Sequence, residues 1–142
     1  AMVAVLASGK LWGQALAPGE RFAAAVAFYP GCFTLTPKNF APYEIVNPDI
    51  DKPLLVLMGE DDNETPAEDC VKRLDPLIKA GAPVELHTYP KTTHCWDCKH
   101  LDSHAKTDFR GNHVVYRYNR EVTEDSARRM FDFFERTMPK KP

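Results

Sequence analysis

The chain has 142 residues, of which 44% are hydrophobic and 27% charged, and its formal net charge is −2 at pH 7. These values fit one globular domain with a core, and the near-neutral charge gives no electrostatic reason to expect nucleic acid or an anionic membrane as a partner. No apolar run approaches the roughly 18 residues that span a membrane, and residues 1–8 lack the basic segment of a signal peptide, so the localisation stays open between cytoplasmic and exported.

The first part of the chain predicts a helix and two buried strands. Residues 1–16 carry a broadly apolar face and predict a helix that begins at or before the first residue. The continuous apolar runs 22–29 and 53–58 are typical of central strands that are covered on both faces. Residues 33–52 are rich in proline and polar residues without a period, which predicts a loop over one end of the sheet.

A second helix is predicted to begin near residue 65. Thr65 has the side chain of an N-cap, Pro66 suits the first helical position, and Glu68 stands at the capping-box position. Pro76 should kink or interrupt this helix, and Gly81 should end it in the left-handed conformation that glycine tolerates.

The last part of the chain predicts an edge strand, a polar loop and a final helix. Residues 84–88 alternate between apolar and polar side chains, as in a third strand near the edge of a sheet, and His87 on the wetter face is expected to be inert. Residues 98–119 lack a sustained period apart from a short extended piece at 114–116. Alternating helices and strands indicate a parallel α/β sheet. Thr123 is predicted to cap the last helix, whose apolar residues recur at helical spacing: Ala127, Met130, Phe131, Phe134 and Met138.

Acidic residues and a histidine follow two successive predicted strands. Residues 59–66, Gly-Glu-Asp-Asp-Asn-Glu-Thr-Pro, come directly after one strand, and His94 lies within residues 89–97 after the next. A doubly wound sheet presents the acid and the histidine of a nucleophile–acid–histidine triad in this way. A small-molecule substrate is therefore expected.

The chain resembles the C-terminal half of a member of the dienelactone hydrolase family, which has the α/β-hydrolase fold. This resemblance implies that residues 1–142 form a single partial domain that begins just after the nucleophile elbow, with about three mainly parallel strands flanked by helices. It also implies hydrolysis of an ester or lactone through an acyl-enzyme, without a cofactor or metal. The segments that carry the resemblance occur in the family's order: 21–32, 59–66, 89–97, 111–116 and 131–138.

The family pattern selects Asp62 as the acid and His94 as the general base. Asp61 is the alternative acid, because the sequence does not exclude a slip of one residue in the turn, and Glu60 and Glu64 become loop residues or neighbours of the substrate. The competing interpretation makes Asp62 a turn or capping residue and His94 an ordinary loop histidine.

The nucleophile of such a triad is absent from this sequence. No G-x-S-x-G elbow precedes Asp62, and Ser8 lies within the first predicted helix and follows no strand. Cys32 is a weaker substitute, because it follows the next strand, where the family has a loop beside the substrate. The nucleophile, serine by default, is therefore expected outside this chain, and the chain alone should be inactive or nearly so. Cys32, Phe33 and Trp96 are candidates to line the substrate pocket, with loop packing as their alternative role.

The four cysteines leave two further alternatives open. Cys95 and Cys98 with His100 and His104 are zinc-ligand types, although their spacing does not match a common zinc module. The other two cysteines either form a disulfide, which would favour an exported protein, or remain buried thiols; they are Cys32 and Cys70.

Two interpretations of the whole chain also remain. It is one part of a hydrolase whose upstream sequence supplies the nucleophile, or it is a noncatalytic half-domain that keeps the fold for binding. The missing strands would leave a sheet edge exposed, so we expect association through that edge with the missing half or with a second copy.

Overall fold

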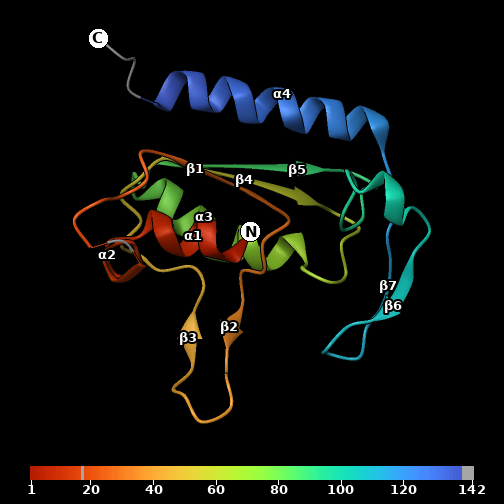
Figure 1. Cartoon of the computed structure of the whole chain (residues 1–142), viewed down its shortest axis with the longest axis horizontal. Helices are drawn as coiled ribbons and strands as arrows, with labels where there is room; N and C mark the ends of the chain where they lie inside the picture. The colour runs from red at the N-terminus through yellow and green to blue at the C-terminus, as the bar shows by residue number, and fades with distance from the viewer. Residues whose placement is uncertain (17, 139–142) are drawn as a thin grey trace.

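The computed structural model describes residues 1–16 and 18–138 and contains a parallel sheet with helices on both faces (Figure 1). Its elements in chain order are α1 (Met2–Ser8), α2 (Lys10–Leu16), β1 (Ala25–Phe28), β2 (Thr34–Leu35), β3 (Tyr43–Glu44), β4 (Leu54–Gly59), α3 (Ala67–Lys79), β5 (Val84–Tyr89), the 3-10 helix η1 (Lys99–Leu101), β6 (Ala105–Thr107), β7 (His113–Val115) and α4 (Arg120–Thr137). No helix within these described ranges is both long and apolar enough to cross a membrane.

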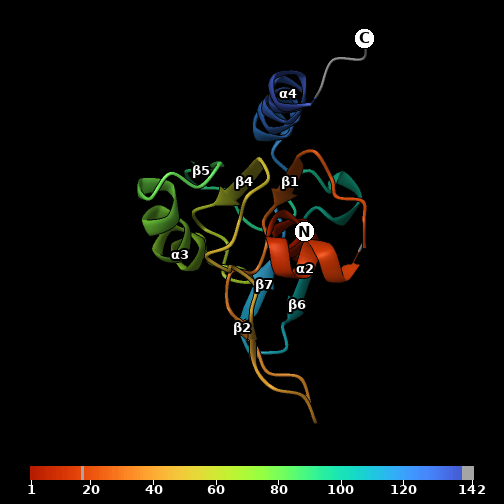
Figure 2. The same cartoon turned by 90° about the vertical axis from the view of Figure 1, so that its left-hand side faces the viewer.

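The central sheet has the strand order β1-β4-β5, and both pairs are parallel. In register, Val56 of β4 lies between Ala27 of β1 and Leu86 of β5. Figures 1 and 2 show α4 alone on one face, with α1 and α3 on the other. The predicted fold class is confirmed, and β5 lies at an edge of this sheet, as its alternating pattern indicated. The strand β1, predicted to be central, forms the other edge within the described residues, where it pairs with β4 alone.

The middle strand β4 supplies both halves of the core. All six of its residues are buried, and successive side chains point to opposite faces. Leu54, Val56 and Met58 pack in the cluster that includes residues of α1 and α3, whereas Leu55 and Leu57 pack with Phe133 of α4. Burial on both faces explains why this segment is continuously apolar.

The single helix predicted for residues 1–16 is wrong, because it is divided at Gly9. This residue forms an antiparallel bridge with Ile50, and the backbone N–H of Leu11 donates to Asp49 Oδ2 at 2.8 Å. A Cβ atom at Gly9 would lie 2.6 Å from Asp49 Oδ1, so a larger residue here would displace this carboxylate. A backbone bridge to a residue 41 positions away in sequence thus sets the boundary between α1 and α2.

Two predictions for the middle of the chain need correction. The loop over residues 33–52 contains the short antiparallel pair β2–β3, which projects below the sheet in Figure 1. The helix α3 begins at Ala67 with Pro66 at the N-cap, and its N-terminus has no side-chain cap. Pro76 lies inside this helix without ending it, and Gly81 adopts a φ of +91° just beyond the helix, as predicted.

The final helix begins earlier than its sequence pattern indicated. Asn119, and not Thr123, is the N-cap, and its side chain accepts a hydrogen bond from the backbone N–H of Val122. The side chain of Phe131 is 65% exposed, whereas Phe133 is buried. The face of α4 that packs on the sheet therefore contains Phe133 and not Phe131, contrary to the predicted apolar face. Residues 98–119, predicted as loop, contain η1 and the hairpin β6–β7.

All four cysteines are paired in disulfides. Cys32 is bonded to Cys70, which ties the segment after β1 to α3 with a Cα–Cα distance of 4.9 Å. Cys95 is bonded to Cys98, a pairing that the sequence interpretation did not include. The Cys32–Cys70 disulfide is the one that would favour an exported protein. Export itself stays a prediction.

Candidate active site

The carboxylate of Asp62 is held in the turn that follows β4. Its Oδ1 atom accepts hydrogen bonds from the backbone N–H groups of Glu64 and Thr65, each at 2.9 Å. Its Oδ2 atom accepts from the hydroxyl of Thr65, also at 2.9 Å. The side chain is fully buried, so these donors compensate for the water that the carboxylate has lost. Thr65, predicted as a helix cap, instead positions this acid.

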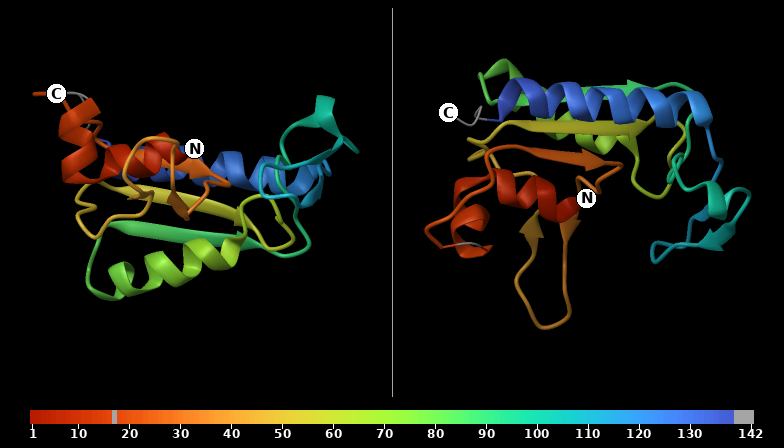
Figure 3. Two further views of the ribbon diagram at one scale, coloured as in Figure 1. Left: turned by 90° about the horizontal axis from the view of Figure 1, so that it is seen from below. Right: turned by 45° about the horizontal axis from the view of Figure 1, so that its top comes forward.

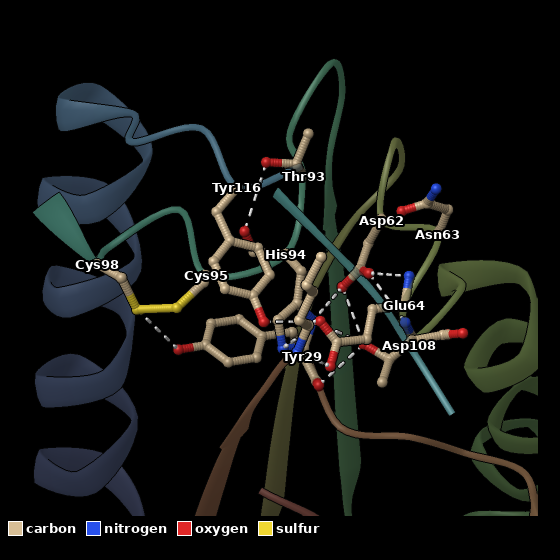
Figure 4. Close-up of polar contacts among 12 residues, drawn as sticks. Tyr29, Asp62, Asn63, Glu64, Thr93, His94, Cys95, Cys98, Asp108 and Tyr116 are labelled. Carbon is tan, nitrogen blue, oxygen red and sulfur yellow. Dashed lines mark hydrogen bonds and ion pairs between the residues drawn. A yellow bond between two sulfur atoms is a disulfide. The ribbon is translucent and has the colours of Figure 1, made fainter. Parts of the chain in front are cut away.

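His94 reaches the same carboxylate from the loop after β5. Its Nδ1 atom lies 2.8 Å from Asp62 Oδ2, as the close-up in Figure 4 shows. The two loops meet because the carboxyl ends of adjacent parallel strands lie at one edge of the sheet, which Figure 3 shows from two further directions. Asp61, the alternative acid, is exposed, and its backbone N–H donates to the carbonyl of Thr92.

Gly59 permits the close approach of these two loops. A Cβ atom at this position would clash with the backbone carbonyl of Thr92, two residues before His94. The end of β4 and the loop that carries the histidine are thus in backbone contact. Glycine is needed here for space, since its φ is not in the left-handed region.

The hydrogen bond to Asp62 assigns the tautomer of His94. A carboxylate can only accept, so in the neutral imidazole Nδ1 carries the proton and Nε2 has a lone pair. This is the tautomer that a general base requires. The side chain of His94 is 13% exposed, which leaves limited access to the ring.

Aromatic residues enclose the histidine ring. The ring centroid of Tyr29 lies 4.3 Å from that of His94, and the centroid of Tyr116 lies 5.6 Å away. Burial and the neighbouring Asp97 raise the pKa of Tyr29, so its hydroxyl stays protonated and donates to Asp97 Oδ1 at 3.0 Å. Tyr29 therefore connects the histidine to the loop at residue 97.

Glu64 lies beside the Nε2 atom of the histidine. Its Oε2 atom is 3.9 Å from His94 Nε2 and accepts a hydrogen bond of 2.8 Å from the hydroxyl of Tyr116. The other oxygen accepts from Lys106 Nζ at 2.8 Å, and this hydrogen bond raises the lysine pKa, so Lys106 is charged. The sequence interpretation missed Lys106 and Tyr116, because the β6–β7 hairpin that brings them here lies in a segment without periodicity.

The three candidate pocket residues differ in exposure. Cys32 is buried and disulfide-bonded, so its sulfur is not available as a thiol nucleophile. Trp96 is fully buried, and its Nε1–H donates to Ser126 Oγ at 3.3 Å, which supports a packing role. Phe33 is partly exposed, and its ring lies 5.1 Å from the guanidinium of Arg110. Contact with a substrate stays a prediction for these three residues. Of the three, only Phe33 is exposed enough to favour it.

Ser8 does not contact this site. Its side chain is buried and its hydroxyl donates to the carbonyl of Ala4 at 2.9 Å, within α1. Within residues 1–16 and 18–138, the hydrogen bonds of His94 involve no serine or cysteine.

The zinc alternative does not assemble as the sequence suggested. Among the described residues, the ligand-type atoms that lie within 4.8 Å of one another belong to Cys95, Asp97 and Cys98, without His100 or His104. Both sulfurs of this group are joined in a disulfide, so neither is a thiolate ligand.

Comparison with known proteins gives the same fold. The family model described as the dienelactone hydrolase family matches residues 8–138. No curated protein sequence matches the chain. A Klebsiella pneumoniae subsp. pneumoniae MGH 78578 protein described as a dienelactone hydrolase has a TM-score of 0.60 and 23% identity, with 79% of this chain and 41% of that chain covered.

Two further solved structures are similar. MGS-M1, an α/β hydrolase enzyme from a Medee basin deep-sea metagenome library, has a TM-score of 0.58 and 17% identity over 93% of this chain and 48% of its own. Esterase 2 of Thermogutta terrifontis, phosphoramylated by tabun, has a TM-score of 0.56 and 17% identity over 87% of this chain and 48% of its own. The chain thus spans less than half the length of these three structures.

Proposed function

Because the chain belongs to the dienelactone hydrolase family, we propose that it carries the acid and the histidine of a hydrolase that cleaves ester or lactone bonds. The observation that carries this proposal is the 2.8 Å contact between His94 Nδ1 and a buried carboxylate of Asp62. Three further donors hold that carboxylate in place, so the pair is oriented before any substrate binds.

The proposed reaction uses a nucleophile outside this chain, by default the hydroxyl of a serine in upstream sequence. Nε2 of His94 takes the hydroxyl proton while the serine oxygen attacks the carbonyl carbon of the substrate. The resulting imidazolium then gives that proton to the leaving alkoxide, which leaves an acyl-enzyme. Water, activated by the same nitrogen, hydrolyses the acyl-enzyme, and the proton returns to the serine. Asp62 keeps the imidazole in one tautomer and stabilises the imidazolium.

Residues around His94 would form part of the substrate pocket. Tyr29 and Tyr116 border the ring, and Glu64 lies beside Nε2, where the reacting oxygen must approach. A substrate would therefore meet a polar wall made by Glu64 and the hydroxyl of Tyr116. Neither a metal nor a cofactor is part of this mechanism.

The proposal is tested by p-nitrophenyl acetate hydrolysis. The chain alone is compared with a version extended upstream through its native sequence, and each is made with His94→Ala. His87→Ala is the matched control, because His87 lies on β5 and packs against Tyr89, away from Asp62. We expect activity only in the extended protein, with a loss of about 10³-fold or more in His94→Ala and none in His87→Ala.

The other results have definite meanings. Absence of hydrolysis in both lengths would contradict the proposal and favour a noncatalytic binding half-domain. Hydrolysis by the short chain that depends on His94 would show that a nucleophile lies within residues 1–142.

The free edge of β1 is the proposed site of association. In the described part of the chain, β1 pairs with β4 alone, so its other edge presents unpaired backbone groups. We propose that this edge pairs with the upstream half of the protein or, in its absence, with a second copy. Sedimentation of the chain as a monodisperse monomer at all concentrations would contradict pairing between copies.

A further inference from the structure

The disulfide between Cys95 and Cys98 closes a ring that starts directly after His94. The two cysteines are three positions apart, and their Cα atoms are 5.2 Å apart. Cys-X-X-Cys is the spacing of cysteine pairs that exchange readily with external thiols. The zinc alternative does not account for this pair, and the proposed hydrolysis does not use it.

The two disulfides of this chain differ in what they constrain. Cys32–Cys70 joins residues that are 38 positions apart, whereas Cys95 and Cys98 are only three positions apart. The first disulfide therefore lowers the conformational entropy of the unfolded chain much more than the second does. Both sulfurs of the first bond belong to buried residues, whereas Cys98 is partly exposed. The short bond therefore contributes less to global stability and is more accessible to a thiolate.

The short ring also fixes the backbone beside the histidine. Cys95 has a φ of +59°, in the left-handed region that residues with a Cβ atom rarely adopt. Trp96, the next residue, is fully buried, and its carbonyl accepts hydrogen bonds from Asn119 and Thr123. These hydrogen bonds hold Trp96 in place whether the disulfide is closed or open. Opening the disulfide would therefore let the backbone relax on the other side of Cys95, where its immediate neighbour is His94.

A second contact connects the ring to the histidine. The hydroxyl of Tyr29 donates to Asp97 Oδ1 inside the ring and lies 4.0 Å from Cys98 Sγ. The same tyrosine packs its ring against His94 at 4.3 Å (Figure 4). The ring thus borders the histidine through the backbone at Cys95 and through the side chain of Tyr29.

We propose that Cys95–Cys98 is a thiol–disulfide exchange site through which a dithiol reductant controls the placement of His94. A thiolate of the reductant attacks Cys98 Sγ, the S–S bond breaks, and Cys95 leaves as a thiolate that takes up a proton. The second thiol of the reductant then attacks the mixed disulfide, which releases Cys98 as a thiol and the reductant as a cyclic disulfide. Two electrons and two protons pass to the protein.

Reduction lowers activity, because the relaxed backbone moves His94 away from Asp62. This consequence for catalysis rests on the proposed function, whereas the exchange chemistry does not. A displacement of about 1 Å in a catalytic group costs up to about 10²-fold in rate, so the reduced extended protein should be about 10- to 100-fold less active than the oxidised one.

The exchange is tested on the chain of residues 1–142. The protein is equilibrated with a series of reduced to oxidised dithiothreitol ratios in the presence of a zinc chelator, blocked with iodoacetamide and digested for mass spectrometry. We expect alkylation of Cys95 and Cys98 at ratios that leave Cys32 and Cys70 bonded, and reformation of the bond after the dithiol is removed. Simultaneous opening of both disulfides would overturn the proposal.

A second measurement tests the link to the histidine. The ¹⁵N signals of the His94 imidazole are recorded before and after reduction, and in the Cys95→Ala/Cys98→Ala variant. We expect reduction and the variant to shift these signals in the same way while the far-ultraviolet circular dichroism is unchanged. If the imidazole signals do not change after selective reduction, the Cys95–Cys98 disulfide has only a structural role and does not control the placement of His94, which would overturn the proposal. These spectra and the alkylation pattern do not depend on catalysis, so an extended protein without esterase activity would overturn the proposed function alone.

Discussion

Replacement of Asp62 separates its two roles, orientation of His94 and stabilisation of the turn. In Asp62→Asn, the amide oxygen can still accept the backbone N–H groups of Glu64 and Thr65. The amide nitrogen then faces His94 Nδ1 and the Thr65 hydroxyl. Since this nitrogen donates, Nδ1 must accept, and the imidazole proton moves to Nε2. Asp62→Ala removes the acceptor for both backbone groups as well.

The two variants should therefore differ in stability and agree in activity. Asp62→Ala leaves two partly buried N–H groups without their acceptor, at about 1–2 kcal/mol each, so about 2–4 kcal/mol of unfolding free energy is lost. Asp62→Asn keeps both bonds and should lose less than about 1 kcal/mol. The wrong tautomer removes the general base, which costs serine hydrolases about 10⁴-fold in rate, or about 5 kcal/mol in activation free energy.

Urea unfolding of residues 1–142 measures the stabilities, and imidazole ¹⁵N spectra of the same chain report which nitrogen of His94 is protonated. Ester hydrolysis is measured in the upstream-extended protein. The reasoning is refuted if Asp62→Asn keeps the proton on Nδ1, or if the two variants unfold at the same urea concentration. Full activity in Asp62→Asn would show that this carboxylate does not orient the base.

Two further substitutions test the scaffold around the site, and a third tests an ion pair at the opposite end of the sheet. Gly59→Ala should destabilise the chain by about 1–3 kcal/mol and shift the His94 imidazole signals, because the new Cβ meets the carbonyl of Thr92; unchanged spectra would contradict this. Trp96→Ala should cost about 3–5 kcal/mol in urea unfolding because the indole is fully buried, and a smaller loss would favour a pocket-lining role. The guanidinium of Arg21 lowers the pKa of Asp51 from its ordinary value of 3.8. The contribution of this carboxylate to stability should therefore be complete above 3.8 and be lost as the pH falls through the lowered pKa of the folded state; a stability difference between the protein and Asp51→Asn that does not decrease as the pH is lowered from about 5 to about 2 would count against this.

Local patterns in the sequence were enough to predict the three strands and the places of β4 and β5 in the sheet, although not the edge position of β1. The run 53–58 is apolar throughout because β4 is covered on both faces, and residues 84–88 alternate because β5 lies at the edge. Strand direction follows from the helix between them, since parallel neighbours need a crossover connection. The same order places residues 62 and 94 beyond the same edge of the sheet.

Boundaries and caps were less predictable, because distant residues decide them. The break at Gly9 depends on Asp49, and Asn119 supersedes Thr123 as the cap of α4. Thr65 has the sequence features of an N-cap, yet its hydroxyl bonds the buried carboxylate of Asp62. In each case a hydrogen bond or a close approach in the folded chain overrides a preference that is local in sequence.

The sequence by itself determined the fold class and the order of an acid and a histidine after successive strands, since apolar periodicity and family motifs are written in consecutive residues. Only the tertiary structure decided that Asp62 and not Asp61 contacts His94, and that Glu64 lies beside Nε2. It also decided that Cys95 is bonded to Cys98. These outcomes depend on side-chain directions and on loops that meet at one edge of the sheet. A shift of one residue in the turn after β4 would place a different carboxylate against the imidazole ring.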